Sequence, residues 1–228
     1  MLAPKALLFD LDNTLLDHTS AEKQAKRIVY ETYFQSIIWD RFEERFDFHN
    51  ARIWEQISKQ EITPKMARTD RFERTIMDLD LGDLPVGEIS EYYLQTYSRF
   101  WAFSPHAEEV LQALYPKYRL GTITNGFTDV QMGKIRHFGL DRLFSVIALS
   151  DEVGIMKPQK GIFDYACSQL KLLPVQCVFI GDIYEVDIVG ANQAGWKSVF
   201  YNPGDVSVAH SVADWEIRSL VELKDLFD

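Results

Sequence analysis

Two aspartates, two residues apart, directly follow an apolar run near the start of the chain. Asp10 and Asp12 stand in the segment LLFDLDNTLLD, where residues 7–9 lead straight into the first carboxylate. Carboxylates this close at the end of a buried strand repel one another unless a cation joins them. Mg²⁺ prefers oxygen ligands, commonly one or two carboxylates together with phosphate and water. Such a pair alone is usually a solvated turn, but together with the aspartates described next it predicts a magnesium site.

Further polar residues follow three apolar runs later in the chain. They are Thr124, Asn125 and Gly126, then Lys157 just before a helix start, and finally Asp182 with Asp187 five residues on. An aspartate can attack phosphorus as a covalent nucleophile. Lys157 would neutralise phosphate charge, while the Thr124 hydroxyl and the loop amides near Asn125 and Gly126 would donate hydrogen bonds to it. These residue types favour phosphoryl transfer, although Asp187 alone is also typical of an exposed helix residue.

The elements that must position these residues form an alternating pattern. Five apolar runs are typical of buried parallel strands: residues 5–10, 118–124, 144–149, 176–182 and 197–202. Helical patterns separate the last four, and two of the helices are expected to begin at Pro105, after Ser104 as N-cap, and at Pro158. This alternation predicts an α/β fold with a doubly wound parallel sheet. Ligands bind such sheets at the carboxyl ends of the strands, where the polar groups are expected to meet.

The stretch between the first two strands has a different pattern. It carries no strand signal and instead shows amphipathic helical patterns at about 20–46, 49–59, 64–80 and 86–101, with a break at Thr63-Pro64. We expect residues 17–101 to form an all-helical insertion after the first strand. Residues 1–16 and 102–228 would then form the catalytic core.

The insertion contains three arginines at a spacing of three, Arg68, Arg71 and Arg74. At that spacing they can share one helical face. One interpretation is a solvated basic stripe, and the other is that Arg68 or Arg71 binds the leaving group or base of the substrate. The aromatic residues of the insertion are expected mostly to form its core, with one or two available to stack on a nucleobase.

Composition narrows the classes of function. A net charge of −10 over 228 residues argues against binding to nucleic acid polymers. No window approaches the roughly 20 apolar residues of a membrane span, and Asp10 interrupts any signal-peptide-like stretch. The two cysteines are expected to be reduced thiols, and the histidines lack zinc-site spacing. We expect a cytoplasmic protein whose partner is a small phosphorylated metabolite, with no obligate protein partner evident.

The four motifs DLDNTL (10–15), TITNG (122–126), KP (157–158) and GDIYEVD (181–187) resemble, in this order, those of the haloacid dehalogenase-like hydrolases. The resemblance implies a Rossmann-like core with a helical cap. It also implies that Asp10 is the nucleophile, which forms an aspartyl-phosphate, and that Asp12 is general acid and then general base. Thr124 and Lys157 would bind the phosphoryl group. Asp10, the Asp12 backbone carbonyl and Asp182 would hold Mg²⁺, with support from Asp187.

Residues 124–166 are most similar to the pyrimidine 5′-nucleotidase branch of that family. We therefore expect a Mg²⁺-dependent phosphomonoesterase acting on nucleoside 5′-monophosphates or a similar small phosphometabolite. Alternatives are a sugar-phosphate phosphatase or phosphomutase, of the phosphoglycolate phosphatase or β-phosphoglucomutase type, and, more remotely, a non-catalytic metabolite-binding regulator. Asp12 argues against a dehalogenase, which needs no second aspartate. Ile183 departs from the family pattern, because many relatives have Ser or Thr there.

Overall fold

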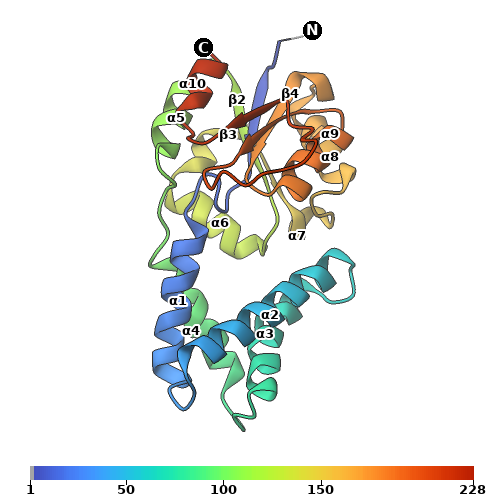
Figure 1. The fold of residues 1–228 in the computed structure, drawn as a ribbon. Coiled ribbons are helices and arrows are strands. Elements are labelled where there is room, and N and C mark those ends of the chain that lie inside the picture. Colours follow the sequence, from blue (N-terminus) through green and yellow to red (C-terminus); the bar gives the residue numbers. More distant parts are fainter. Residues whose placement is uncertain (1–2) are drawn as a thin grey trace. The chain divides into compact units, whose positions relative to one another are not determined.

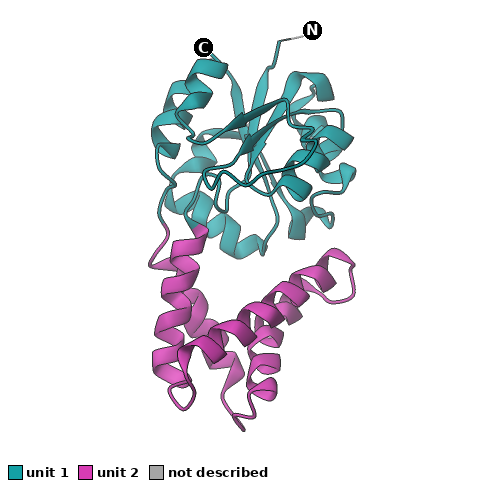
Figure 2. Ribbon diagram, viewed as in Figure 1, with its two compact units in different colours: residues 1–17, 102–228 teal, residues 18–101 magenta. Residues whose placement is uncertain are grey.

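The computed structural model describes residues 3–228, so the first two residues of the expected 1–16 segment lie outside the described residues (Figure 1). The chain folds into two compact units (Figure 2). Residues 1–17 and 102–228 form the first, called here the sheet unit, and His18–Trp101 form the second, called here the helical unit. None of the helices in the described residues is long and apolar enough to span a membrane.

The sheet unit contains six parallel strands, which confirms the predicted doubly wound α/β fold. In spatial order they are β3 (Phe144–Leu149), β2 (Arg119–Thr124), β1 (Ala6–Phe9), β4 (Cys177–Gly181), β5 (Lys197–Tyr201) and β6 (Trp215–Ile217). Sequence analysis missed β6, because three residues are too short to give a strand pattern. The central pair β1 and β4 is in register with Phe9 opposite Ile180. That register brings the residues following both strands to one edge.

Helices cover both faces of the sheet, and the residues of β1 alternate between the two faces. Leu7 and Phe9 pack with α5 (Ala107–Leu114), α6 (Thr128–His137) and α10 (Glu222–Leu226). Ala6 and Leu8 pack with α8 (Lys160–Leu170) and α9 (Val189–Gln193) on the other face (Figure 1). The shorter turns are α7 (Ser150–Val153), the 3₁₀ turns η1 (Leu140–Arg142) and η2 (Pro174–Gln176), and the π-turn η3 (Tyr184–Ile188). Because both faces are covered, β1 is apolar throughout.

The predicted starts of two core helices were wrong. Helix α5 begins at Ala107 rather than at Pro105, because the backbone amide of Ser104 is bonded to the Leu15 carbonyl at 2.9 Å and His106 has a left-handed φ of 65°. Helix α8 begins at Lys160, two residues after Pro158. The Asn125 side chain is hydrogen-bonded to the backbone amide and carbonyl of Lys157, the residue before Pro158. These bonds hold the backbone there, so the helix begins only after this segment.

The helical unit contains α1 (His18–Tyr33), α2 (Trp39–Ser58), α3 (Pro64–Asp78) and α4 (Val86–Ser98). The predicted single helix over 20–46 was wrong, because the chain reverses between Tyr33 and Trp39. The reversal buries Phe34 against Phe42, with ring centroids 4.5 Å apart. No proline or glycine marks this break in the sequence. The Thr63-Pro64 break is confirmed, since the Thr63 hydroxyl caps α3.

The first prediction concerns the packing of β2 against β3. A β-carbon on Gly121 would lie 2.6 Å from Val146 Cγ1 and 2.7 Å from the Val146 carbonyl oxygen. We expect Gly121→Ala to lower the free energy of unfolding by about 1–3 kcal/mol, because this close backbone approach cannot relax cheaply. A β-carbon on Gly87 in α4 would have nothing within 4 Å. Gly87→Ala should therefore raise the free energy of unfolding by about 0.5 kcal/mol. Urea denaturation measures both, and equal effects would contradict this account.

Candidate active site

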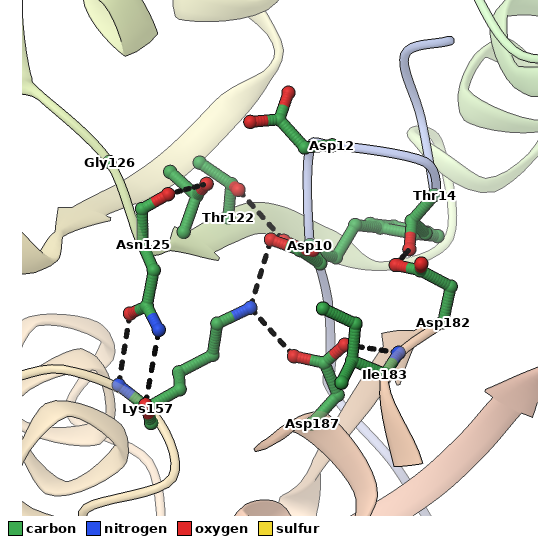
Figure 3. Close-up of polar contacts among 12 residues, drawn as sticks. Asp10, Asp12, Thr14, Thr122, Asn125, Gly126, Lys157, Asp182, Ile183 and Asp187 are labelled. Atoms are coloured by element: carbon green, nitrogen blue, oxygen red, sulfur yellow. Dashed lines mark hydrogen bonds and ion pairs between the residues drawn. The ribbon is translucent and has the colours of Figure 1, made fainter. Parts of the chain in front are cut away.

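The candidate site lies at the carboxyl ends of β1, β2 and β4 (Figure 3). Lys157, in the segment after α7, extends its ammonium group between two of the aspartates predicted from sequence. Its Nζ is 2.9 Å from Asp10 Oδ1 and 2.7 Å from Asp187 Oδ1. The structure therefore brings together carboxylates that follow β1 and β4 with a lysine from a third segment.

Lys157 is buried, and its position is fixed by the loop after β2. The Asn125 side chain accepts a hydrogen bond from the Lys157 amide at 3.0 Å and donates one to the Lys157 carbonyl at 3.1 Å. Asn125 thus holds the backbone from which the lysine extends. Burial by itself would lower the pKa of Lys157, but Asp10 and Asp187 outweigh that effect and raise it. The lysine is therefore a permanent positive charge in the site.

Asp10, Asp182 and Asp187 form a carboxylate cluster in which one oxygen from each residue lies within 4.8 Å of the others. Burial raises the pKa of Asp10 to about 8, opposed by Lys157 and reinforced by the neighbouring carboxylates. Burial and Asp187 raise the pKa of Asp182 to about 6. Carboxylates held this close disfavour their own ionisation unless a cation joins them. The donor set consists of hard oxygens, which fits a divalent ion such as Mg²⁺.

Asp187 is fully buried, so the interpretation of it as an exposed helix residue was wrong. It lies in η3, where its Oδ2 accepts a hydrogen bond from the Ile183 amide at 2.9 Å. Gly181 leaves the space that the Asp187 carboxylate occupies, because a β-carbon there would overlap it. The site thus requires glycine at the end of β4. Ile183 contributes through its backbone, while its side chain is half-exposed.

Thr14 is a site residue that sequence reasoning missed. Its hydroxyl donates a hydrogen bond to Asp182 Oδ1 at 3.0 Å (Figure 3). The residue belongs to the same segment as Asp10 and Asp12, and it is completely buried. The sequence feature that could have identified Thr14 is its position, four residues after Asp10 in a segment already assigned to the site.

Asp12 contacts a different set of residues. Its carboxylate accepts hydrogen bonds from Lys134 Nζ at 2.6 Å and Gln131 Nε2 at 3.2 Å, both on α6. In Figure 3 the Asp12 side chain points away from Lys157. Sequence reasoning missed both α6 residues, and the only signal was a pair of polar residues three apart on the helix that follows β2.

Thr124 and Gly126 lie where β2 ends. The buried Thr124 hydroxyl accepts a hydrogen bond from Gln131 Nε2 at 2.7 Å. A β-carbon on Gly126 would lie 2.9 Å from the Gln131 side chain, so glycine is required for this close approach. The Gly126 amide donates to the Ser150 hydroxyl at 3.2 Å. The roles of Thr124, Asn125 and Gly126 in substrate binding stay predictions.

Arg68 and Arg71 lie on α3 in the helical unit. The solvated-stripe interpretation is wrong for Arg71, whose exposed fraction is 5%. Its guanidinium stacks over the Tyr93 ring at 4.6 Å and the Phe72 ring at 5.5 Å, and burial lowers its pKa. Arg74 instead contacts Asp70. The predicted role of Arg68 and Arg71 in substrate binding stays a prediction.

This fold and site define a doubly wound α/β protein whose strand ends combine a buried lysine with a carboxylate cluster suited to a hard cation. The family comparison agrees with that class. The model of the haloacid dehalogenase-like hydrolases matches residues 4–195, and the chain belongs to that family.

Two related proteins align with this chain over nearly its whole length. The pyrimidine 5′-nucleotidase YjjG of Escherichia coli is 28% identical over 222 residues, covering 96% of each chain. Human N-acylneuraminate-9-phosphatase is 28% identical over 233 residues, covering 97% of this chain and 93% of its own. The crystal structure of the magnesium-bound putative hydrolase YfnB of Bacillus subtilis has the same fold, with a TM-score of 0.84, 24% identity and complete coverage of both chains.

The raised pKa values of Asp10 and Asp182 generate a prediction for the metal-free protein. The unfolded chain releases these protons near pH 3.8, whereas the folded chain holds them to about pH 6 and about pH 8. Because the folded state binds more protons across this interval, the free energy of unfolding should fall as pH rises from about 4 to about 8. We expect Asp10→Asn to flatten this fall.

Urea denaturation in EDTA at several pH values within the interval measures the effect. Asp164→Asn is the matched control, because Asp164 lies on α8 and pairs with the exposed Lys160. A slope that is the same in Asp10→Asn and in the wild type would contradict the assigned pKa of Asp10.

Proposed function

We propose that this protein is a Mg²⁺-dependent phosphomonoesterase that works through an aspartyl-phosphate on Asp10. The observation that carries the proposal is Lys157, which lies 2.9 Å from Asp10 at the edge of the carboxylate cluster. A buried lysine beside a buried carboxylate neutralises phosphate charge at the point where that carboxylate can attack. Two of the relatives named above, a pyrimidine 5′-nucleotidase and an N-acylneuraminate-9-phosphatase, support this reaction class.

The residues divide the reaction between them. An Asp10 oxygen forms a bond to phosphorus while the bond from phosphorus to the leaving oxygen breaks, and that oxygen takes a proton from Asp12. Water then attacks phosphorus, gives a proton to Asp12, and the bond to Asp10 breaks. Lys157 and the Thr124 hydroxyl hold the phosphoryl oxygens throughout, with the loop amides at Asn125 and Gly126 as further donors.

The magnesium ion would be held by Asp10, the Asp12 backbone carbonyl and Asp182, with Asp187 in support. When bound, it supplies positive charge that stabilises the charge on the transferring phosphoryl group. Asp187 is already engaged by Lys157 and by the Ile183 amide. It therefore supports the ion by fixing the surroundings of Asp10 and Asp182.

The proposed substrates are nucleoside 5′-monophosphates or similar small phosphometabolites. Similarity to a pyrimidine 5′-nucleotidase supports this class, and similarity to an N-acylneuraminate-9-phosphatase supports the alternative of a sugar-phosphate phosphatase. In this proposal residues 17–101 act as the cap, and Arg68 or Arg71 contacts the leaving group. The proposed location is the cytoplasm.

The nucleophile assignment predicts a specific loss of activity. Asp10→Asn should lower kcat for p-nitrophenyl phosphate by a factor on the order of 10³ or more, because the covalent route is removed. Addition of EDTA should abolish wild-type activity, and Mg²⁺ should restore it. Asp164→Asn, with its exposed carboxylate, should keep wild-type kcat. Asp10→Asn with wild-type turnover, or full activity in EDTA, would contradict the proposal.

The substrate class predicts a ranking. Across a panel of nucleoside monophosphates and sugar phosphates, kcat/KM for the best pyrimidine monophosphate should exceed that for the best sugar phosphate by about tenfold, equivalent to about 1.4 kcal/mol of transition-state binding. Initial rates of phosphate release measure this. The reverse ranking would favour the sugar-phosphate phosphatase, and transfer of phosphate to a sugar hydroxyl would favour the phosphomutase.

A further inference from the structure

Two polar side chains of α6 are almost completely buried in the sheet unit. Gln131 is 1% exposed and Lys134 is 2% exposed. They lie three residues apart and so share one face of the helix. Neighbouring positions on α6 serve the apolar core, where Ile135 is buried and Met132 packs against the same cluster. The phosphoryl-transfer roles proposed above do not use either polar residue.

Burial of a lysine is costly unless its ammonium is paired and hydrogen-bonded. Lys134 meets this requirement with Asp12, at 2.6 Å from Nζ to Oδ1. The Asp12 side chain is 24% exposed, whereas that of Lys134 is 2% exposed. The ion pair therefore fixes the Asp12 carboxylate from the α6 side.

Gln131 connects the same carboxylate to the loop after β2. Its Nε2 donates to Asp12 Oδ2 at 3.2 Å and to the Thr124 hydroxyl at 2.7 Å. An amide nitrogen carries two hydrogens, so it can make both bonds at once. Gly126 leaves room for this side chain. One glutamine thus fixes the distance between Asp12 and the proposed phosphoryl-binding threonine.

We propose that Lys134 and Gln131 are positioning residues that set the orientation of the Asp12 carboxylate relative to the phosphoryl group. Each of the two Asp12 oxygens has its own donor from α6, which restricts rotation of the carboxylate. The proposal rests on the proposed function and extends it to a helix outside the four motifs. It implies that α6 controls proton donation to the leaving oxygen and proton removal from water.

The test uses leaving groups of different basicity. An alkyl phosphate such as a nucleoside monophosphate needs a proton on its leaving oxygen, whereas p-nitrophenolate leaves without one. We expect Lys134→Met to lower kcat/KM for the alkyl phosphate by about 10- to 100-fold, which is less than the roughly 10²- to 10⁴-fold contribution of general acid–base catalysis because Asp12 itself remains. For p-nitrophenyl phosphate, kcat/KM should fall less than about threefold. This parameter reports transfer of the phosphoryl group to Asp10, and p-nitrophenolate leaves in that step without a proton from Asp12.

A second readout follows hydrolysis of the phosphoenzyme. Water attack also uses Asp12, so in Lys134→Met this step should become the slower one for p-nitrophenyl phosphate. A rapid-mixing experiment should then show a burst of p-nitrophenol whose amplitude approaches the enzyme concentration. If Lys134 only stabilises the fold, Lys134→Met should lower kcat/KM for both substrates by the same factor and produce no burst.

Two controls isolate the role of the ion pair. Lys160→Met removes an exposed lysine that pairs with Asp164 on α8. This variant should leave kcat/KM for both substrates unchanged. In an Asp12→Asn background, Lys134→Met should have little additional effect on the alkyl phosphate, because a residue that acts through Asp12 is not additive with its loss. Gln131→Leu serves if Lys134→Met does not fold. It should lower kcat/KM for both substrates, because Gln131 also bonds Thr124, but it should lower that for the alkyl phosphate further.

Equal losses for both substrates, or full additivity with Asp12→Asn, would overturn the positioning role. Failure of the wild type to hydrolyse any phosphate ester would instead overturn the proposed function, so the two failures are distinguishable.

Discussion

The constraint on which the site depends is the neutralisation of buried negative charge at the end of two neighbouring strands. Asp10, Asp182 and Asp187 bring three carboxylates within 4.8 Å, and Lys157 supplies one positive charge. If all are ionised, two negative charges remain without compensation, which is the charge of one divalent cation. Burial raises the pKa of Asp10 and of Asp182 for the same reason. The cluster therefore carries excess negative charge that bound protons or a divalent cation would balance.

The fold meets this constraint through neighbouring backbone segments rather than through long side chains. Strands β1 and β4 are adjacent, and the amide of Asp10 bonds to the Ile180 carbonyl at 2.9 Å. Gly181 then leaves space for the Asp187 carboxylate, which the π-turn η3 returns to the strand end. Lys157 arrives from a third segment, held by Asn125. Each charged group is therefore fixed by backbone that the sheet has already positioned, as pre-organised electrostatic stabilisation requires.

The sequence predicted the part of this arrangement that local pattern encodes. Apolar runs ending in acid identified β1 and β4, and their parallel order placed Asp10 and Asp182 at one edge. It did not predict Gln131 and Lys134, because a polar pair on a helix has the pattern of a solvated face and only tertiary packing buries it. The reversal at Phe34 was missed for a similar reason, since ring packing rather than a proline or glycine ends α1.

Ile183 illustrates why a departure from a motif is best judged by contacts rather than by residue type. The motif position acts through its amide, which bonds to Asp187 Oδ2, and any residue except proline supplies an amide. The missing hydroxyl has a counterpart in Thr14, which donates to Asp182 Oδ1 from the segment after the neighbouring strand β1. The carboxylates near the proposed ion thus keep both a backbone donor and a hydroxyl donor. A side-chain change at position 183 therefore alters the exposed surface beside the site more than the charge balance within it.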